Sequence, residues 1–225
     1  VVDTTALDLL ALSAASLSVT AGGAVTDSGT LAITGATTIS ASGQDITLDE
    51  AASTFGTLAL TGVNVAVTEN AATDLGATTV SGTLGITSAG AVTDSGTLAI
   101  TGATTISASG QDITLDDAAS TFGTLALTGA NVAVTENEAT DLGASTVSGT
   151  FGITSGGAIT DSGTQTITGA ATFTNTAGTN DAITLDDASN AFSGTVTFST
   201  DSGSAVTVVD TTALDLLALS AASLS

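Results

Sequence analysis

The stretch AVTDSGTLAITGATTISASGQDITLD decides the fold, and it occurs twice without a change, at residues 24–49 and 91–116. Apolar residues alternate with Ser, Thr and Ala in short runs such as LAIT and TTIS, and these runs are separated by Gly, Ser, Asn or Asp. Alternation with a period of two and enrichment in β-branched residues are typical of β-strands. The TG, SG and EN pairs indicate turns in which Gly supplies a positive φ without steric cost. The chain is therefore expected to be all-β.

This stretch opens a repeating block. Blocks 24–90 and 91–157 are equally long and differ only at Glu50/Asp117, Val63/Ala130, Ala71/Glu138, Thr78/Ser145, Leu84/Phe151 and Ala89/Gly156. A diverged third block, 158–225, is incomplete, and residues 1–23 correspond to the tail of a preceding block. Residues 1–18 return unchanged as 208–225, which defines a 207-residue period and makes a full third block slightly longer than the other two. A chain that copies itself builds length, so we expect residues 1–225 to form one continuous solenoid segment in which residue 225 leads into another copy of residue 19.

Nine strand-like pieces can be counted in each 67-residue block. They divide into three coils of three strands, with about 22 residues per coil, which predicts a right-handed parallel β-helix (β-solenoid) of nine to ten coils. With a strand spacing of about 4.8 Å, a block would rise roughly 14 Å and the whole period roughly 43 Å. Residues 6–17, ALDLLALSAASL, could instead form an amphipathic helix capped by Asp3 or Thr4. Their alignment with strand-and-turn residues of the other blocks favours strands.

The composition excludes several classes of function. The chain contains 22 acidic residues and no Lys, Arg or His, so its formal net charge is −22, yet 42% of its residues are hydrophobic. Such a polyanion is repelled by nucleic acid and anionic membranes, and no apolar run approaches the roughly 18 residues of a membrane span. We therefore expect neither a nucleic-acid partner nor membrane insertion. The absence of Cys excludes disulfides and thiolate metal sites.

Carboxylates are the remaining candidates for chemistry, because without His, Cys and Lys no nucleophile–base pair can form. We therefore predict no enzyme activity, no catalytic residue and no cofactor. Adjacent acidic residues would point to opposite faces of a strand but could converge at a turn. They are interpreted first as solvated turn carboxylates and alternatively as calcium ligands. These weak calcium candidates are Asp49, Glu50, Asp116, Asp117, Asp186 and Asp187. A polysaccharide-degrading enzyme would need carboxylates that break the repeat, for which only Asp201 and Asp210 are available.

Two further patterns concern side chains of the strands. Phe55, Phe122 and Phe192 recur at one position of the block, which predicts an aromatic stack in the core or, alternatively, lateral contacts between fibres. Thr-x-Thr sequences occur at 164–168, 172–176 and 195–197, as in ice-binding solenoids. Blocks 24–90 and 91–157 lack the regularity of a flat ice-binding face, so the strand preference of Thr is the better explanation.

The segments TLAITGATTISASGQDITLD, FGTLALTGANVAVTEN and GAVTDSGTLAITG resemble repeats of filamentous-haemagglutinin-like proteins and related giant bacterial surface proteins. The resemblance covers essentially the whole chain and implies a right-handed parallel β-helix that is secreted and displayed as a long fibre. It implies an extracellular or cell-surface location in a bacterium. The expected function is a rigid acidic rod within a filament, which partners with itself end to end and could bundle laterally. The alternative is an adhesin stalk that binds a host or cell-surface receptor.

Overall fold

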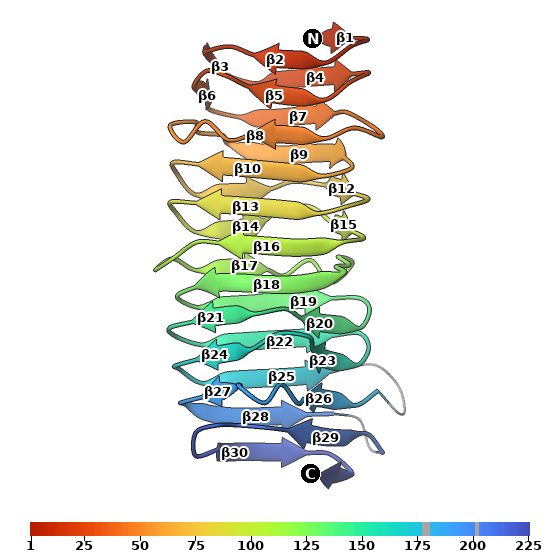
Figure 1. Cartoon of the computed structure of the whole chain (residues 1–225), viewed down its shortest axis with the longest axis vertical. Coiled ribbons are helices and arrows are strands. Elements are labelled where there is room, and N and C mark those ends of the chain that lie inside the picture. The colour runs from red at the N-terminus through yellow and green to blue at the C-terminus, as the bar shows by residue number, and fades with distance from the viewer. Residues whose placement is uncertain (177–180, 201–202) are drawn as a thin grey trace.

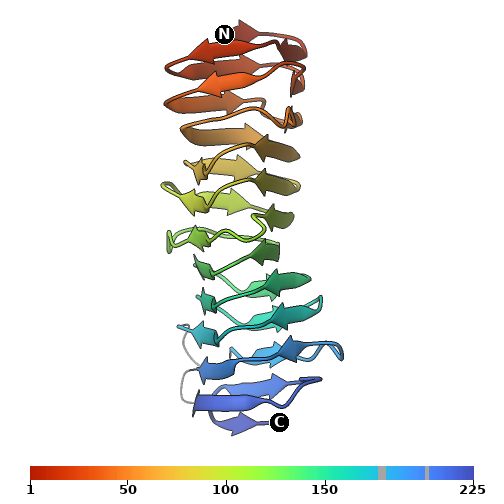
Figure 2. The ribbon, with the colours of Figure 1, turned by 90° about the vertical axis from the view of Figure 1, so that its left-hand side faces the viewer.

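A computed structural model of the chain describes residues 1–176, 181–200 and 203–225. These residues form a β-solenoid of about 11 turns with roughly 20 residues per turn, which confirms the predicted fold class. The turns stack into a straight rod with the two termini at opposite ends (Figures 1 and 2). The described residues contain no helix at all, and hence none that is long and apolar enough to cross a membrane.

Two long sheets form the walls of the rod. The first sheet, over the described residues, has 14 strands: β1 (Val2–Asp3), β4 (Leu17–Ala21), β7 (Ala36–Ser40), β9 (Thr57–Gly62), β11 (Thr73–Leu75), β12 (Thr78–Val80), β14 (Val92–Asp94), β15 (Leu98–Ile100), β17 (Ile113–Leu115), β19 (Val132–Glu136), β22 (Phe151–Ser155), β25 (Ala171–Asn175), β28 (Thr195–Ser199) and β30 (Asp215–Ser220).

The second sheet has 15 strands within the same described ranges: β2 (Leu7–Leu9), β5 (Val25–Asp27), β8 (Ile46–Leu48), β10 (Val65–Glu69), β13 (Leu84–Ser88), β16 (Ala103–Ser107), β18 (Thr124–Gly129), β20 (Thr140–Leu142), β21 (Ser145–Val147), β23 (Ile159–Asp161), β24 (Gln165–Ile167), β26 (Ile183–Leu185), β27 (Ala191–Phe192), β29 (Ala205–Val208) and β31 (Ser223–Leu224). A separate pair consists of β3 (Leu12–Ala14) and β6 (Leu31–Ile33). The strands β2, β3 and the start of β4 replace the possible helix at 6–17, so the strand interpretation is confirmed.

All strand pairs among the described residues are parallel, and they join strands of successive turns. Ala66, for example, lies beside Gly85, which lies beside Thr105. In most turns a long strand on one sheet faces two short strands on the other. Alternate side chains point inward, as in β10, where Val65 and Val67 are buried and Ala66 is exposed. The period-two pattern of the sequence thus becomes an apolar core between two sheets.

Each 67-residue block makes three and a half turns. The pairing Thr57–Asp74–Thr93–Thr114 runs down the first sheet and covers three turns, close to the roughly 20 residues per turn of the rod as a whole. The chain then crosses the rod to Thr124, the repeat equivalent of Thr57, which lies in the second sheet. Equivalent residues of successive blocks therefore lie on opposite faces.

The prediction of three whole coils per block was therefore wrong. The sequence count missed a tenth segment, because Thr54 and Thr121 each form only an isolated bridge to a neighbouring short strand. Nine of the ten segments form three turns of three segments each. The tenth, a long strand, supplies the half-turn. A block then rises about 17 Å and a full period about 50 Å, rather than the expected value of about 43 Å.

The half-turn also separates the identical ends of the chain. A 207-residue period contains three blocks and hence ten and a half turns on the block geometry. Leu17 accordingly lies in β4 of the first sheet, whereas its equivalent Leu224 lies in β31 of the second. The same sequence thus pairs correctly on either wall of the rod, and a given face returns only after two periods.

The phenylalanines are buried, as predicted, but Phe55, Phe122 and Phe192 do not stack on one another. Phe55 and Phe122 lie three and a half turns apart and therefore on opposite sides of the core. The aromatic cluster is instead centred on Phe173, which is fully buried. Its ring centroid lies 5.8 Å from that of Phe151, 5.9 Å from Phe192 and 5.6 Å from Phe198.

Most glycines serve close approach rather than a positive φ, contrary to the expectation for the turns. Among the described residues only Gly43, Gly110 and Gly203 have positive φ values. Gly102 is typical of the larger group, because a Cβ at this position would overlap the backbone oxygen of Gly82 in the previous turn. Neighbouring turns thus touch backbone to backbone at the corners of the rod.

Candidate functional site

The acidic pairs singled out as calcium candidates lie in turns, where an aspartate of the previous turn binds their backbone. Asp27 accepts hydrogen bonds from the amides of Asp49 at 2.8 Å and Glu50 at 3.4 Å. Burial raises the pKa of Asp27, and the charge of Asp49 adds to the rise, while the two amides oppose it. The other blocks repeat the arrangement: Asp94 binds the amides of Asp116 and Asp117, and Asp161 binds those of Asp186 and Asp187.

The structure does not gather these pairs into a larger cluster. Within the described part of the chain, no three acidic side chains are grouped so that they could hold a metal ion. Asp117 instead accepts hydrogen bonds from the Thr97 hydroxyl, one turn earlier, and from the Ala119 amide of its own turn, each at 2.9 Å. This agrees with turn carboxylates, which were the first interpretation, and calcium binding stays the untested alternative.

Other outward carboxylates bind hydroxyl groups one turn above and below. Asp74 accepts from Thr57 Oγ1 at 2.8 Å and Ser95 Oγ at 2.9 Å, and Asp141 repeats this with Thr124 and Ser162. Hydroxyl donors thus stabilise charges that cannot find a basic partner in this chain.

The most unusual groups are two buried glutamates that the sequence reasoning did not single out. Glu69 is 1% exposed and Glu136 is 3% exposed. The carboxylate of Glu69 accepts a hydrogen bond from the Phe55 amide at 2.7 Å, and that of Glu136 accepts one from the Phe122 amide at 3.1 Å. The signal was present, because the alternation of Val132 and Val134 places Glu136 on the inward face.

These glutamates lie where a column of short strands ends, a position that we call a block junction. At the second junction, Ile100 donates its amide to the Thr121 oxygen in the next turn, but Phe122 has no further short strand to which it could donate. The carboxylate of Glu136 takes the place of the missing strand oxygen. Asp210 accepts from the Phe192 amide at 3.1 Å at the third junction.

Burial governs the electrostatics of the junction carboxylates. Burial raises the pKa of Glu136 to about 7, and the nearby charge of Glu138 contributes to this rise. The Thr140 hydroxyl and the Phe122 amide lower the pKa and so oppose the rise. The pKa of Glu69 is also raised by burial and is opposed by Phe55 and Thr73. Glu138 has no counterpart beside Glu69, because the equivalent residue is Ala71.

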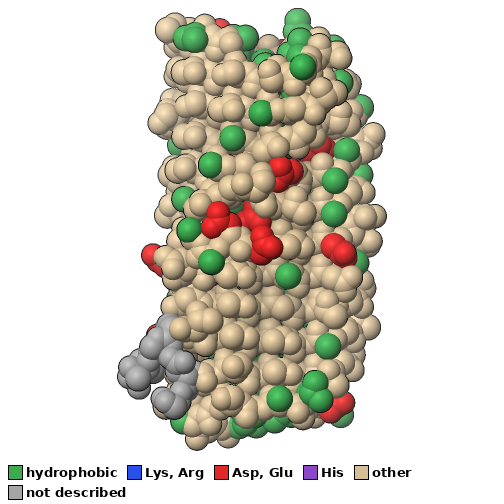
Figure 3. All heavy atoms as spheres, turned by 180° about the vertical axis from the view of Figure 1, so that it is seen from behind, with side chains coloured by type: hydrophobic (Ala, Val, Ile, Leu, Met, Phe, Trp, Pro, Cys, Tyr) green, Lys and Arg blue, Asp and Glu red, His purple; other side chains and the backbone are tan. Residues whose placement is uncertain are grey.

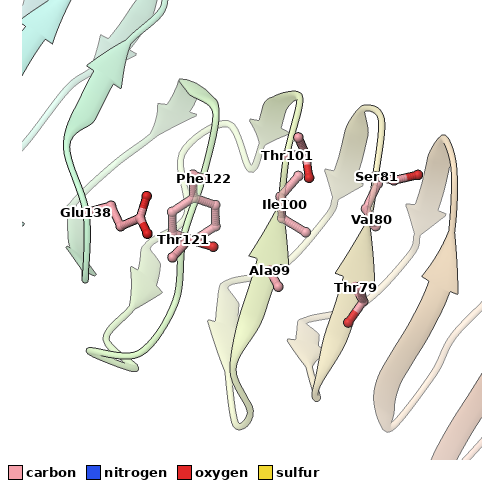
Figure 4. Close-up of a pocket in the computed structure, with 9 residues that line it drawn as sticks. All are labelled: Thr79, Val80, Ser81, Ala99, Ile100, Thr101, Thr121, Phe122 and Glu138. Atoms are coloured by element: carbon pink, nitrogen blue, oxygen red, sulfur yellow. The ribbon is translucent and has the colours of Figure 1, made fainter.

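A recess of about 350 Å³ lies at the second junction (Figure 4). Its outer wall is the row Thr79–Ala99–Thr121, in which the small Ala99 leaves a notch between two threonines. Glu138 closes one end of the row, with its carboxylate next to Thr121 and Phe122 (Figure 4). The lining also includes the hydroxyl-bearing Ser81 and Thr101 and the apolar Val80 and Ile100.

The three junctions differ in the residues that shape this recess. The first junction has the row Ser13–Ala32–Thr54 and carries Ala71 in place of Glu138. The third has the row Thr146–Thr166–Ala191, in which Thr166 fills the notch, and Thr212 in place of Glu138. A notch and a free carboxylate therefore coincide at the second junction alone among these three.

The two non-repeated aspartates were the candidates for an enzyme site that breaks the repeat. Asp201 lies outside the described residues. Asp210 is engaged by the Phe192 amide and by Thr212, whose hydroxyl donates to its carboxylate at 2.9 Å. Asp210 is therefore a capping residue of the third junction.

Comparison with known proteins places the repeats in a family. A family model described as "Repeats of unknown function (DUF5649)" matches residues 1–61, 62–128 and 129–199, which together make up most of the chain. The middle match has the 67-residue length of the sequence block. No curated protein matches the chain significantly, and neither does any solved structure. The chain therefore belongs to the family of repeats of unknown function DUF5649.

Proposed function

We propose that this chain is a non-enzymatic structural segment of a long bacterial surface fibre, in which it acts as a rigid acidic rod. The observation that carries the proposal is the distribution of exposed apolar side chains. Among the described residues, the large exposed ones all belong to the two copies of the 18-residue segment at the ends: Val1, Val2, Leu10, Leu12, Val209, Leu217, Leu219 and Leu224. The sides of the rod between these segments expose no large apolar side chain among the described residues. The end turns do expose such side chains, and a further turn stacked on them would bury these.

The side walls support this role. Figure 3 shows a face made mostly of uncharged polar side chains and backbone, with acidic groups gathered near its middle. With no basic side chain in the chain, neighbouring rods repel one another over a Debye length of about 8 Å at physiological salt. Growth along the axis is therefore favoured over lateral bundling.

The likeness of the repeats to filamentous-haemagglutinin-like proteins supports an extracellular location and suggests a second role as an adhesin stalk. In such a stalk the rod would hold a receptor-binding domain away from the cell. The rod would then serve as a mechanical spacer and would not itself bind the receptor.

Electron microscopy tests the proposal. Negatively stained rods of this chain, and of this chain extended by one further 207-residue period, should have equal widths and differ in length by about 50 Å. Immunogold labelling of the source bacterium should mark the cell surface. Globular particles, or a doubled width without added length, would contradict the rod, and label confined to the cell interior would contradict the location.

A further inference from the structure

The recess at the second junction has an unpaired acidic group at one end. Glu138 is exposed, and no hydrogen bond to its carboxylate is formed by the described residues. No salt bridge is available to it either, because the chain contains no Lys, Arg or His. A basic side chain that pairs with this carboxylate must therefore lie outside these 225 residues.

The lining of the recess restricts the kind of cation. A calcium ion takes six to eight oxygen ligands, usually with several carboxylates, whereas this recess offers one. An ammonium group has three N–H donors, so it needs fewer oxygen acceptors than calcium does, and a hydroxyl such as that of Thr121 can be one of them. The apolar atoms of Ala99 and Phe122 suit the methylene stem that carries such a group.

We infer that the second junction binds a primary alkylammonium group, as borne by a lysine side chain or a polyamine. The ammonium pairs with Glu138, and the stem lies along the notch at Ala99 between Thr79 and Thr121. The volume of about 350 Å³ is at the small end of ligand sites, which fits one such group rather than a large ligand. The net charge of −22 attracts cations to the rod as a whole, and the recess selects where one is held.

The natural differences between junctions supply matched variants. Glu138→Ala gives the second junction the residue of the first and removes the pairing charge. Ala71→Glu gives the first junction, which also has an alanine notch at Ala32, the residue of the second. Because Ala71 and Glu138 occupy equivalent positions of the block, neither change should disturb the sheets.

A titration followed by NMR tests the inference. The probe is Nα-acetyl-lysine N-methylamide, its uncharged counterpart is Nα-acetyl-norleucine N-methylamide, and 1,5-diaminopentane is the free amine. The lysine probe should shift the amides of 99–101 and 121–122 saturably, at a concentration at least tenfold lower than it shifts those beside Glu50. Glu138→Ala should abolish the tight response, Ala71→Glu should add a second one at 32–34, and the norleucine compound should produce none.

Occupancy has a second readout. Because the charge of Glu138 contributes to the raised pKa of Glu136, pairing with an ammonium should lower the titration midpoint of Glu136 below about 7. If diaminopentane binds as well as the lysine probe, a polyamine suffices as the source, whereas preference for the lysine probe indicates a protein partner. Equal shifts beside Glu50 and Glu138, or an unchanged response in Glu138→Ala, would overturn the inference and leave only general attraction to a polyanion. Neither result depends on whether the rod forms a fibre.

Discussion

Replacing Glu136 by Gln should remove much of the pH dependence of the rod's stability. The folded pKa of Glu136 is about 7, against an ordinary value of 4.5, because the side chain is 3% exposed. The folded state therefore binds the proton more tightly than the unfolded state does. The associated stabilisation is fully present below pH 4.5 and is lost as the pH rises through 7. It amounts to roughly 3 kcal/mol.

The Gln variant keeps an oxygen that can accept from the Phe122 amide, but it cannot ionise. Urea unfolding at pH 5 and pH 8 should show the native chain losing about 2 to 3 kcal/mol more than the variant over this interval. Glu50→Gln, which removes one charge from a half-buried turn position, is the control and should follow the native chain. The chain has only four Glu residues, so Glu-selective ¹³C labelling should also resolve a carboxyl carbon that titrates near pH 7. If Glu136→Gln loses as much stability between pH 5 and 8 as the native chain, the account of the junction carboxylate is refuted.

Three further outcomes follow from the packing. Gly102→Ala should lower the free energy of unfolding in urea by several kcal/mol, because the new Cβ would overlap the Gly82 oxygen. Gly85→Ala, whose Cβ would have its nearest contact at 3.9 Å, should leave the free energy nearly unchanged. Equal losses in the two variants would contradict the close-approach role. Phe173→Ala should destabilise by about 3 to 5 kcal/mol, and Thr172→Ala on the outer face of the same strand by much less. Calorimetry should give the same melting temperature in millimolar calcium and in chelator, because no three acidic side chains of the described residues are grouped so that they could hold an ion. A rise of several degrees in calcium would instead support the calcium interpretation.

The strand content was predictable because it depends on local patterning. The nine pieces counted in the block 24–90 all appear as strands, from Val25–Asp27 to Leu84–Ser88. Alternation requires one face to be buried, and that requirement is visible in the sequence of each strand alone. The acidic pairs were likewise placed correctly at turns.

The number of turns per block was not predictable by counting strands. The segment at Thr121 consists of one bridging residue, and a single residue carries no alternation. The junction glutamates escaped notice for a related reason. The alternation pattern places their side chains inward. Their role is to accept a backbone amide where a column of short strands ends, and the position of that end depends on how the turns stack. The glycine columns also arise from contacts between turns, so the sequence indicated their positions but not their role.

One 67-residue block makes three and a half turns and therefore places equivalent residues on opposite faces, which distances between paired labels can test. The chain has no cysteine, so pairs of cysteines can be introduced and spin-labelled without interference. Ala66 and Ala126 lie on the same face three turns apart, through Gly85 and Thr105, while Ala133 is the repeat equivalent of Ala66. Labels at 66 and 126 should be about 14 Å apart along one face, and labels at 66 and 133 should be farther apart across the rod. A shorter distance for 66 and 133 than for 66 and 126 would show three whole turns per block and contradict the claim.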